Sequence, residues 1–212
     1  MKTGQFISVL ALWLVTGCIP MKSEFGQLSR GMYQDQITIP IDLPANAPSV
    51  SQLFWLLPDD GGGAQNRNEH LGIDITAQRD TPVIAPADGV VVSAFFEPMY
   101  GNRIVVEHDK TRDGKRIQTS YWHLNNRKVE VGDKVRRGQL LGGLGNTGAM
   151  ASGILHVHFA VLEEQPRGEM RPVDPSRYWS GGVGKVECYN PHRYWPRGGT
   201  KFTYPVACAA KK

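Results

Sequence analysis

Two histidines one residue apart, His156 and His158, stand in the apolar stretch LHVHFAV from Leu155 to Val161. Because side chains alternate between the two faces of a strand, both imidazoles would lie on one face, opposite the apolar residues. A single histidine is often half-buried and satisfied by backbone groups. Two neighbours would each need partners, since an unpaired buried polar group costs roughly 1–3 kcal/mol. The pair therefore raises the question of whether the shared partner is a metal ion.

Two further stretches place polar groups in a similar way. In HLGID, His70 and Asp74 would share one face of an extended chain. In SYWHLN, Tyr121 and His123 would share one face, opposite the apolar Trp122. Three separate strands are thus expected to offer imidazole or carboxylate groups on the face away from the core.

These residue types suit a catalytic zinc ion, which takes three protein ligands from His, Asp or Glu and keeps a fourth position for water. His70, Asp74 and one histidine of LHVHFAV would supply that set. The two remaining histidines would then serve proton transfer and the stabilisation of developing charge. Strand geometry does not say which of His156 and His158 touches the ion, and each motif alone also occurs by chance.

The elements that must position these groups are short strands. From Thr81 onward, apolar segments alternate with Gly, Pro and Asp turns, and no segment keeps the apolar periodicity of a helix. We therefore predict an all-β fold of mainly antiparallel strands. The strand-like segments are PVIAP, GVVVSAFF, NRIVVEHD, IQTSYWHL, QLLGGLG and LHVHFAVL.

The composition is that of one globular domain of ordinary size with appendages. The 212 residues are 41% hydrophobic and 21% charged, with a formal net charge of +4 and a pI of about 9.0. Lys and Arg are scattered along the chain, so nucleic acid is not an expected partner. A polyanionic cell wall or an anionic membrane would attract the protein weakly. We expect a monomer.

The N-terminus has the features of an export signal. Lys2 precedes the apolar run Phe6–Val15, which is too short to cross a bilayer as a helix. The run ends in Val15-Thr16-Gly17-Cys18, which resembles the bacterial lipobox, whose cysteine becomes lipid-modified and begins the mature chain. An ordinary secretory signal is the alternative. Ile19 after the cysteine favours, by resemblance to Gram-negative sorting signals, the outer membrane facing the periplasm.

The C-terminal part holds the two remaining cysteines, Cys188 and Cys208. An exported protein meets an oxidising environment, so we expect these cysteines to pair. The disulfide would close a 21-residue segment and contribute about 2–4 kcal/mol in the usual loop-entropy account. The expected parts of the chain are a signal peptide over 1–17, a tether over 18–50, a folded domain over 51–179 and a C-terminal extension over 180–212.

Taken together, the three polar motifs resemble those of a known family. HLGID, SYWHLN and LHVHF match, in order, the H-x-x-x-D, Y-x-H-L and H-L-H-F motifs of the lysostaphin/LytM-type zinc endopeptidases, metallopeptidase family twenty-three. The resemblance implies a LytM-type β-sandwich and one zinc ion per chain, held by His70, Asp74 and His158. It also implies that His156 is the general base and His123 the second catalytic histidine.

The resemblance covers roughly half of the chain, from His70 to Tyr178. Upstream of it, the family's S-x-F-G-x-R approach to the first motif is replaced by FWLLPDDGGGAQNRNE, which would line one wall of the substrate groove. Substrate preference is therefore not carried over. His192, Tyr194 and Trp195 lie in the tail beyond it and are interpreted as local packing.

The resemblance implies a peptidoglycan endopeptidase acting on stem peptides and cross-bridges. In the periplasm the bond would be the D-alanyl to diaminopimelate link, which makes the activity that of a D,D-endopeptidase. A biotinyl or lipoyl carrier domain shares the V-x-V-G-D-x-V-x-x-G-Q pattern found here, but the chain lacks the carrier's lysine at a hairpin tip. A catalytically silent activator of a cell-wall amidase would have lost zinc ligands that this chain retains. Either alternative predicts protein that purifies without stoichiometric zinc.

Overall fold

The computed structural model describes residues 39–55, 69–196 and 200–210. The expected signal peptide, the lipobox with Cys18 and most of FWLLPDDGGGAQNRNE lie outside these ranges. Within them the chain forms strands and two short 3-10 helices, and the paired strands are all antiparallel. The predicted all-β, mainly antiparallel class is therefore confirmed. No helix in the described ranges has the length and hydropathy needed to cross a membrane.

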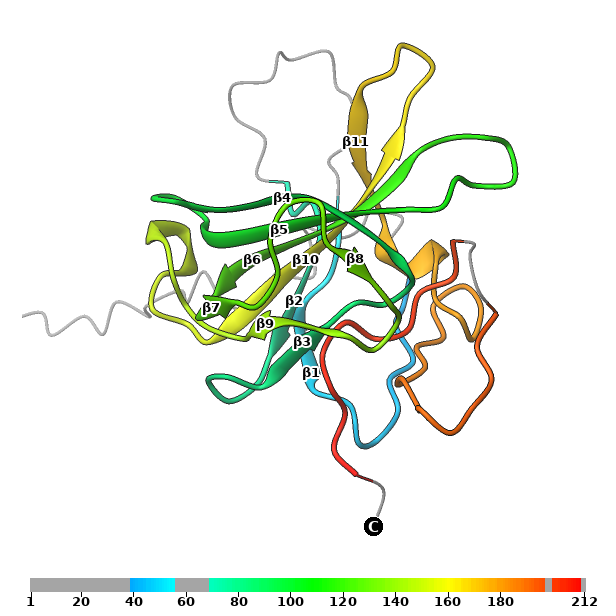
Figure 1. Ribbon diagram of the computed structural model, residues 1–212. Helices are drawn as coiled ribbons and strands as arrows, with labels where there is room; N and C mark the ends of the chain where they lie inside the picture. The colour runs from blue at the N-terminus through cyan, green and yellow to red at the C-terminus, as the bar shows by residue number, and fades with distance from the viewer. Residues whose placement is uncertain (1–38, 56–68, 197–199, 211–212) are drawn as a thin grey trace, which may run out of the picture.

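The larger of two sheets has eight strands (Figure 1). Seven follow the spatial order β1-β2-β10-β6-β5-β4-β8, and β11 pairs with the C-terminal half of β10. The bounds are β1 Ser49–Gln52, β2 Ile73–Thr76, β4 Gly89–Glu97, β5 Gly101–His108, β6 Ile117–Leu124, β8 Lys134–Val135, β10 His156–Glu164 and β11 Met170–Val173. The long central strands β10, β6 and β5 thus come from the segments that carry the chemical motifs or adjoin them.

The smaller sheet has the order β3-β9-β7. Its strands are β3 Pro82–Ile84, β9 Leu140–Gly143 and β7 Asn126–Arg127, and the 3-10 helices are η3 Ala149–Ala151 and η4 Pro175–Arg177. Glycine is required in β9 because a Cβ on Gly142 would lie 2.2 Å from the carbonyl oxygen of Asn126. The glycine-rich QLLGGLG segment therefore lets β7 and β9 approach closely.

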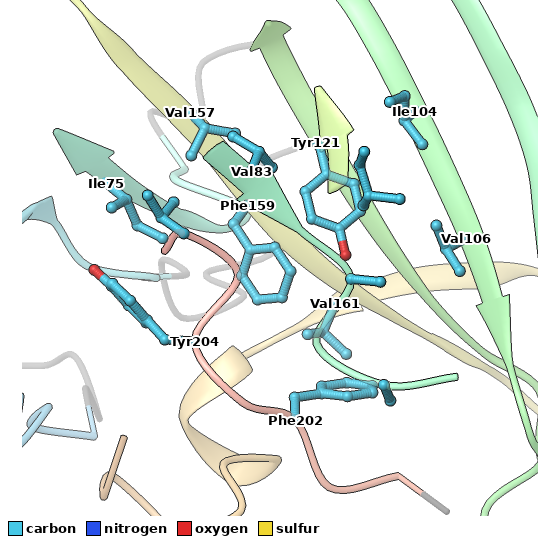
Figure 2. Close-up of a cluster of buried hydrophobic side chains, with 14 of the residues drawn as sticks. Ile75, Val83, Ile104, Val106, Tyr121, Val157, Phe159, Val161, Phe202 and Tyr204 are labelled. Carbon is cyan, nitrogen blue, oxygen red and sulfur yellow. The ribbon is translucent and has the colours of Figure 1, made fainter. Parts of the chain in front are cut away.

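Alternate strand positions meet in one apolar core between the two sheets (Figure 2). Figure 2 shows Val83 of the smaller sheet beside Val157 of β10, with Phe159 further along the same strand. All three are fully buried. Other fully buried core residues labelled in Figure 2 are Ile75, Ile104, Val106, Tyr121, Val161, Phe202 and Tyr204.

Segments on both sides of the 51–179 range pack on this core. The backbone N–H of Asp42 donates a 2.7 Å hydrogen bond to the carbonyl oxygen of Gly184. Near the C-terminus, Val206 bridges Val83 of β3, so the red segment in Figure 1 runs beside the smaller sheet. The first strand of the large sheet begins at Ser49. Chain that flanks the three polar motifs therefore contributes directly to the fold.

Cys188 and Cys208 form a disulfide with their Cα atoms 6.0 Å apart. The pairing predicted from the cysteine count is confirmed. Beside it, the side-chain amide of Asn46 donates a 2.6 Å hydrogen bond to the carbonyl oxygen of Ala209. The disulfide thus fixes the end of the extension next to the N-terminal segment.

Candidate metal centre and active site

Three side chains converge on the outer face of the large sheet. Two come from the adjacent strands β2 and β10, and the third comes from the chain just before β2. Strand pairing places Asp74 of β2 directly opposite His158 of β10. His70 lies just before β2 and is held by two backbone hydrogen bonds with Trp55, of 3.0 and 3.1 Å. The alternation of Ile73 and Asp74 in β2 follows the sequence pattern, with isoleucine toward the core.

The ligand atoms of these residues form a nearly equilateral triangle. Nε2 of His70 is 3.2 Å from Oδ1 of Asp74, and Nδ1 of His158 is 3.0 Å from the same oxygen. The two histidine nitrogens are 3.2 Å apart. In a tetrahedral zinc site with bonds of about 2.0–2.1 Å, ligand atoms lie about 3.3 Å apart. The triangle therefore has the size of one face of such a site.

The protonation of the triangle suits a cation. Nδ1 of His70 lies 2.7 Å from the carbonyl oxygen of Leu53, which can only accept, so Nδ1 carries a proton and Nε2 is the nitrogen that can offer a lone pair to a metal ion. Burial alone would raise the pKa of the Asp74 carboxyl, but the neighbouring imidazoles of His158 and His70 outweigh it and hold that pKa well below its usual range. Burial lowers the pKa of His158. An ionised carboxylate and imidazole lone pairs thus face one point, and this donor set fits a divalent metal.

Two more histidines lie beside the triangle. Nδ1 of His156 is 3.0 Å from the carbonyl oxygen of Ile154, and Nδ1 of His123 is 2.9 Å from that of Thr147. In the neutral rings Nδ1 is therefore the donor and Nε2 the acceptor. The ring centroids are 4.7 Å apart. Nε2 of His156 is 3.9 Å from Oδ1 of Asp74, farther than any side of the triangle. The structure thus brings together all five residues predicted from the motifs.

His123 has an unusual backbone conformation that aims its side chain. Its φ is +65°, in the left-handed region that non-glycine residues rarely adopt. Backbone hydrogen bonds hold it there, from His123 N–H to Tyr100 O (3.0 Å) and from Thr147 N–H to His123 O (3.3 Å). Burial lowers the pKa of His123 to about 4, against the hydrogen bond with Thr147. The ring is therefore neutral near pH 7.

The prediction that Tyr121 shares the polar face with His123, and Trp122 the apolar face, is wrong. Tyr121 is fully buried in the core, and its hydroxyl hydrogen-bonds Oγ1 of Thr119. Trp122 lies on the outer face, stacked on His158 with centroids 4.4 Å apart. The left-handed turn at His123 breaks the alternation on which the prediction relied.

Sequence reasoning missed several residues that position the site. Thr147 orients His123, Leu53 fixes the tautomer of His70, and Trp122 covers His158. The glycine-rich GLGNTG segment, which contains Thr147, was a partial sequence signal for the contact with His123. There Gly148 has φ +85°, and a Cβ on Gly145 would lie 2.7 Å from the carbonyl oxygen of His123. The contacts through Leu53 and Trp122 depend on the tertiary fold and leave no local pattern.

An antiparallel β fold that joins such a triangle to two acceptor histidines defines a candidate metallohydrolase. The model of Peptidase family M23 matches residues 68–175, just over half of the chain. The protein belongs to this family. The recognition of metallopeptidase family twenty-three from the three motifs is therefore confirmed.

The matches to individual relatives cover different shares of those proteins. Peptidoglycan DD-endopeptidase ShyC of Vibrio cholerae is 36% identical over 100 residues, which are 46% of this chain and 22% of the relative. Uncharacterized lipoprotein YgeR of Escherichia coli is 31% identical over 148 residues, 66% of this chain and 53% of the relative. The solved catalytic domain of lysostaphin from Staphylococcus simulans is 29% identical, with 60% of this chain and 89% of that chain covered and a TM-score of 0.48. The chain thus spans from about a fifth to about half of these curated relatives.

Proposed function

We propose that this protein is a zinc-dependent peptidoglycan endopeptidase in which His70, Asp74 and His158 hold one zinc ion. The observation that carries the proposal is the triangle of three ligand atoms 3.0–3.2 Å apart, with the acceptor nitrogens of two further histidines beside it. Membership of Peptidase family M23 supports the peptidase activity. Similarity to a relative named peptidoglycan DD-endopeptidase supports the substrate class.

Zinc suits the donor set because it accepts imidazole nitrogen and carboxylate oxygen in tetrahedral geometry. Three protein ligands would leave the fourth position open, as catalytic zinc sites require. When bound, zinc would acidify a water molecule toward neutrality and polarise the scissile carbonyl.

His156 would act as the general base. Its Nε2 is an acceptor on the side of the triangle, and Nδ1 donates to the carbonyl oxygen of Ile154. That hydrogen bond persists when Nε2 takes a proton, so the ring needs no reorientation during the reaction. The same nitrogen could then return the proton to the leaving amine.

His123 would orient the attacking water. Its Nδ1 is engaged with Thr147 and its pKa is lowered to about 4, so at neutral pH Nε2 accepts a hydrogen bond and does not donate one. Of the two roles open to this histidine, positioning the water therefore fits better than donation to a developing oxyanion.

We extend the proposal to the setting of the enzyme. The substrate would be the D-alanyl to diaminopimelate cross-link, cut by a D,D-endopeptidase in cell-wall remodelling. A lipid on Cys18 would anchor a monomer in the cell envelope, at the outer membrane facing the periplasm. The expected tether over 18–50 would be shorter than the sequence suggested, because Asp42 and Ser49 already belong to the folded part. Similarity to a relative named lipoprotein YgeR supports the anchor.

The test is incubation of the zinc-loaded protein with purified cell-wall sacculi, followed by mass analysis of the muropeptides. Endopeptidase action converts cross-linked dimers to monomers. Release of whole stem peptides from the glycan would instead indicate an amidase. If the protein cannot be loaded with zinc and leaves the sacculi unchanged, the silent amidase activator is favoured.

A matched control excludes a contaminating hydrolase. His156→Ala removes the proposed base, whereas His192→Ala removes a histidine that is exposed in the C-terminal extension. The proposal expects cleavage by His192→Ala at the wild-type rate and a loss of roughly 10²–10⁴-fold in His156→Ala. Equal rates in both variants would contradict it.

A further inference from the structure

A row of side chains crosses the outer face of the large sheet from the metal centre toward β4. His158 is paired with Asp74 on one side and with Trp122 on the other, and Arg103 of β5 is paired with Phe95 of β4. Trp122 and Arg103 are joined by contact, because the guanidinium carbon lies 5.0 Å from the centre of the indole ring. Since strands β10, β6, β5 and β4 are neighbours in this order (Figure 1), the row is continuous.

Aromatic rings fix the guanidinium of Arg103 in this row. Its carbon lies 5.4 Å from the ring centre of Phe95, 5.6 Å from that of Tyr100 and 5.0 Å from that of Trp122. Contacts of a cation with ring faces at such distances are attractive. Trp122 also stacks on His158 at 4.4 Å. The position of the charge is therefore coupled to a ligand of the metal centre through one ring.

The donors of this guanidinium are poorly satisfied. Its ion-pair partner among the described residues is Glu97 at 4.0 Å. The two Glu97 oxygens accept hydrogen bonds from the backbone N–H groups of Met99 and Tyr100, at 2.9 and 3.2 Å. Nε of Arg103 is buried with no hydrogen-bond partner in the described part of the chain. A guanidinium has five N–H donors, so this one retains the capacity to bind an anion.

The Arg103 side chain remains accessible, with 23% of its surface exposed. Two strand spacings separate β5 from β10, which is roughly 10 Å. An extended peptide covers about 3.3–3.6 Å per residue. A substrate lying across the sheet with its scissile bond at the metal centre would therefore reach Arg103 about three residue lengths from that bond.

We infer that Arg103 is a specificity-determining residue that binds a free carboxylate of the cross-linked peptide substrate. The inference rests on the proposed endopeptidase function. A planar guanidinium matches a carboxylate through paired N–H···O bonds, which a lysine ammonium cannot reproduce. The aromatic rings hold the Arg103 guanidinium in place, so this side chain loses little conformational freedom when the carboxylate binds.

The experiment compares two cross-linked muropeptide dimers that differ in one group, a free carboxylate or a carboxamide on diaminopimelate. Values of kcat and KM are measured for the full-length wild type, Arg103→Gln and Arg103→Lys. Arg171→Gln is the control, because this arginine lies on β11 with 67% of its side chain exposed. The preference for carboxylate over carboxamide is the readout, and being a ratio within one protein it does not depend on the fraction folded.

We expect the wild type and Arg171→Gln to prefer the carboxylate dimer by roughly 10–100-fold in kcat/KM, mainly through KM. Arg103→Gln should cleave both dimers with similar efficiency, and Arg103→Lys should recover part of the preference. An unchanged preference in Arg103→Gln, or an equal loss on both dimers, would overturn the inference.

Binding separates this inference from the proposed function. If the wild type cleaves neither dimer, the endopeptidase proposal fails, and calorimetric titration with the same two dimers still tests Arg103. Tighter binding of the carboxylate dimer by the wild type, lost in Arg103→Gln, would support the anion site. Equal binding of both dimers by the wild type would overturn it.

Discussion

The division of labour between His156 and His158 gives the sharpest prediction. Nδ1 of His158 is one corner of the ligand triangle, 3.0 Å from Oδ1 of Asp74 and 3.2 Å from Nε2 of His70. His158→Ala therefore leaves two of the three ligands, His70 and Asp74. Outer-sphere changes at metal sites typically weaken binding by roughly 10–100-fold, and loss of a direct ligand should exceed that. Nε2 of His156 lies 3.9 Å from Asp74, so His156→Ala should keep the zinc.

The assay combines elemental analysis with thermal unfolding and sacculus digestion. Zinc at a thousandfold excess over its Kd should stabilise the wild type by about 4 kcal/mol. His156→Ala should keep this stabilisation and near-stoichiometric zinc while it loses roughly 10²–10⁴-fold in rate. His158→Ala should lose both the metal and the activity.

A second comparison excludes a general packing effect. His123→Ala should behave as His156→Ala does, because its ring also stands beside the triangle. Zinc lost from His156→Ala but retained in His158→Ala would reverse the assignment. Full activity in both would refute the reasoning altogether.

Three further predictions concern stability and the support of the site. Burial lowers the pKa of His108 to about 4, so the stability that its neutral ring contributes is present above pH 6.5 and is lost as the pH falls to 4. Over that interval, denaturant unfolding should show the wild type losing about 3 kcal/mol more of its free energy of unfolding than His108→Gln does. Parallel curves of stability against pH for the two proteins would contradict this. A Cβ on Gly72 would lie 2.6 Å from Nε2 of His158, so Gly72→Ala should lower zinc affinity by about tenfold or more in a competition titration, and unchanged affinity would show that the ring can move. Reduction of Cys188–Cys208 should lower the free energy of unfolding by about 2–4 kcal/mol, measured by urea denaturation, and an unchanged midpoint would mean that the disulfide does not constrain the unfolded chain.

The local patterns predicted the strands, and they selected the five His and Asp side chains that the structure brings together, because alternation is a property of neighbouring residues. The isoleucines of β2 face the core and Asp74 faces outward, as the HLGID pattern indicates. The cysteine pair was predictable because Cys18, the one other cysteine in the sequence, was assigned to the predicted lipobox. In each case the prediction needed only the pattern of a few neighbouring residues or the number of cysteines.

Where the prediction failed, the cause was long-range. Tyr121 and Trp122 were assigned to the wrong faces because the prediction assumed regular alternation up to His123, and the left-handed backbone of His123 breaks that alternation. The left-handed backbone of His123 is maintained by hydrogen bonds from chain more than twenty residues away in both directions. The sequence did not predict a role for Arg103, since its position depends on the register of β4, β5 and β6.

The most direct test of the central claim is the metal dependence of cleavage of one purified, cross-linked muropeptide dimer, followed by mass spectrometry. We predict that zinc-loaded protein converts the dimer to two monomers by hydrolysis of the cross-link, that protein stripped by a chelator leaves it intact, and that one equivalent of zinc restores cleavage. Cleavage at the same rate by the stripped protein, or an intact dimer with fully loaded protein, would contradict the account.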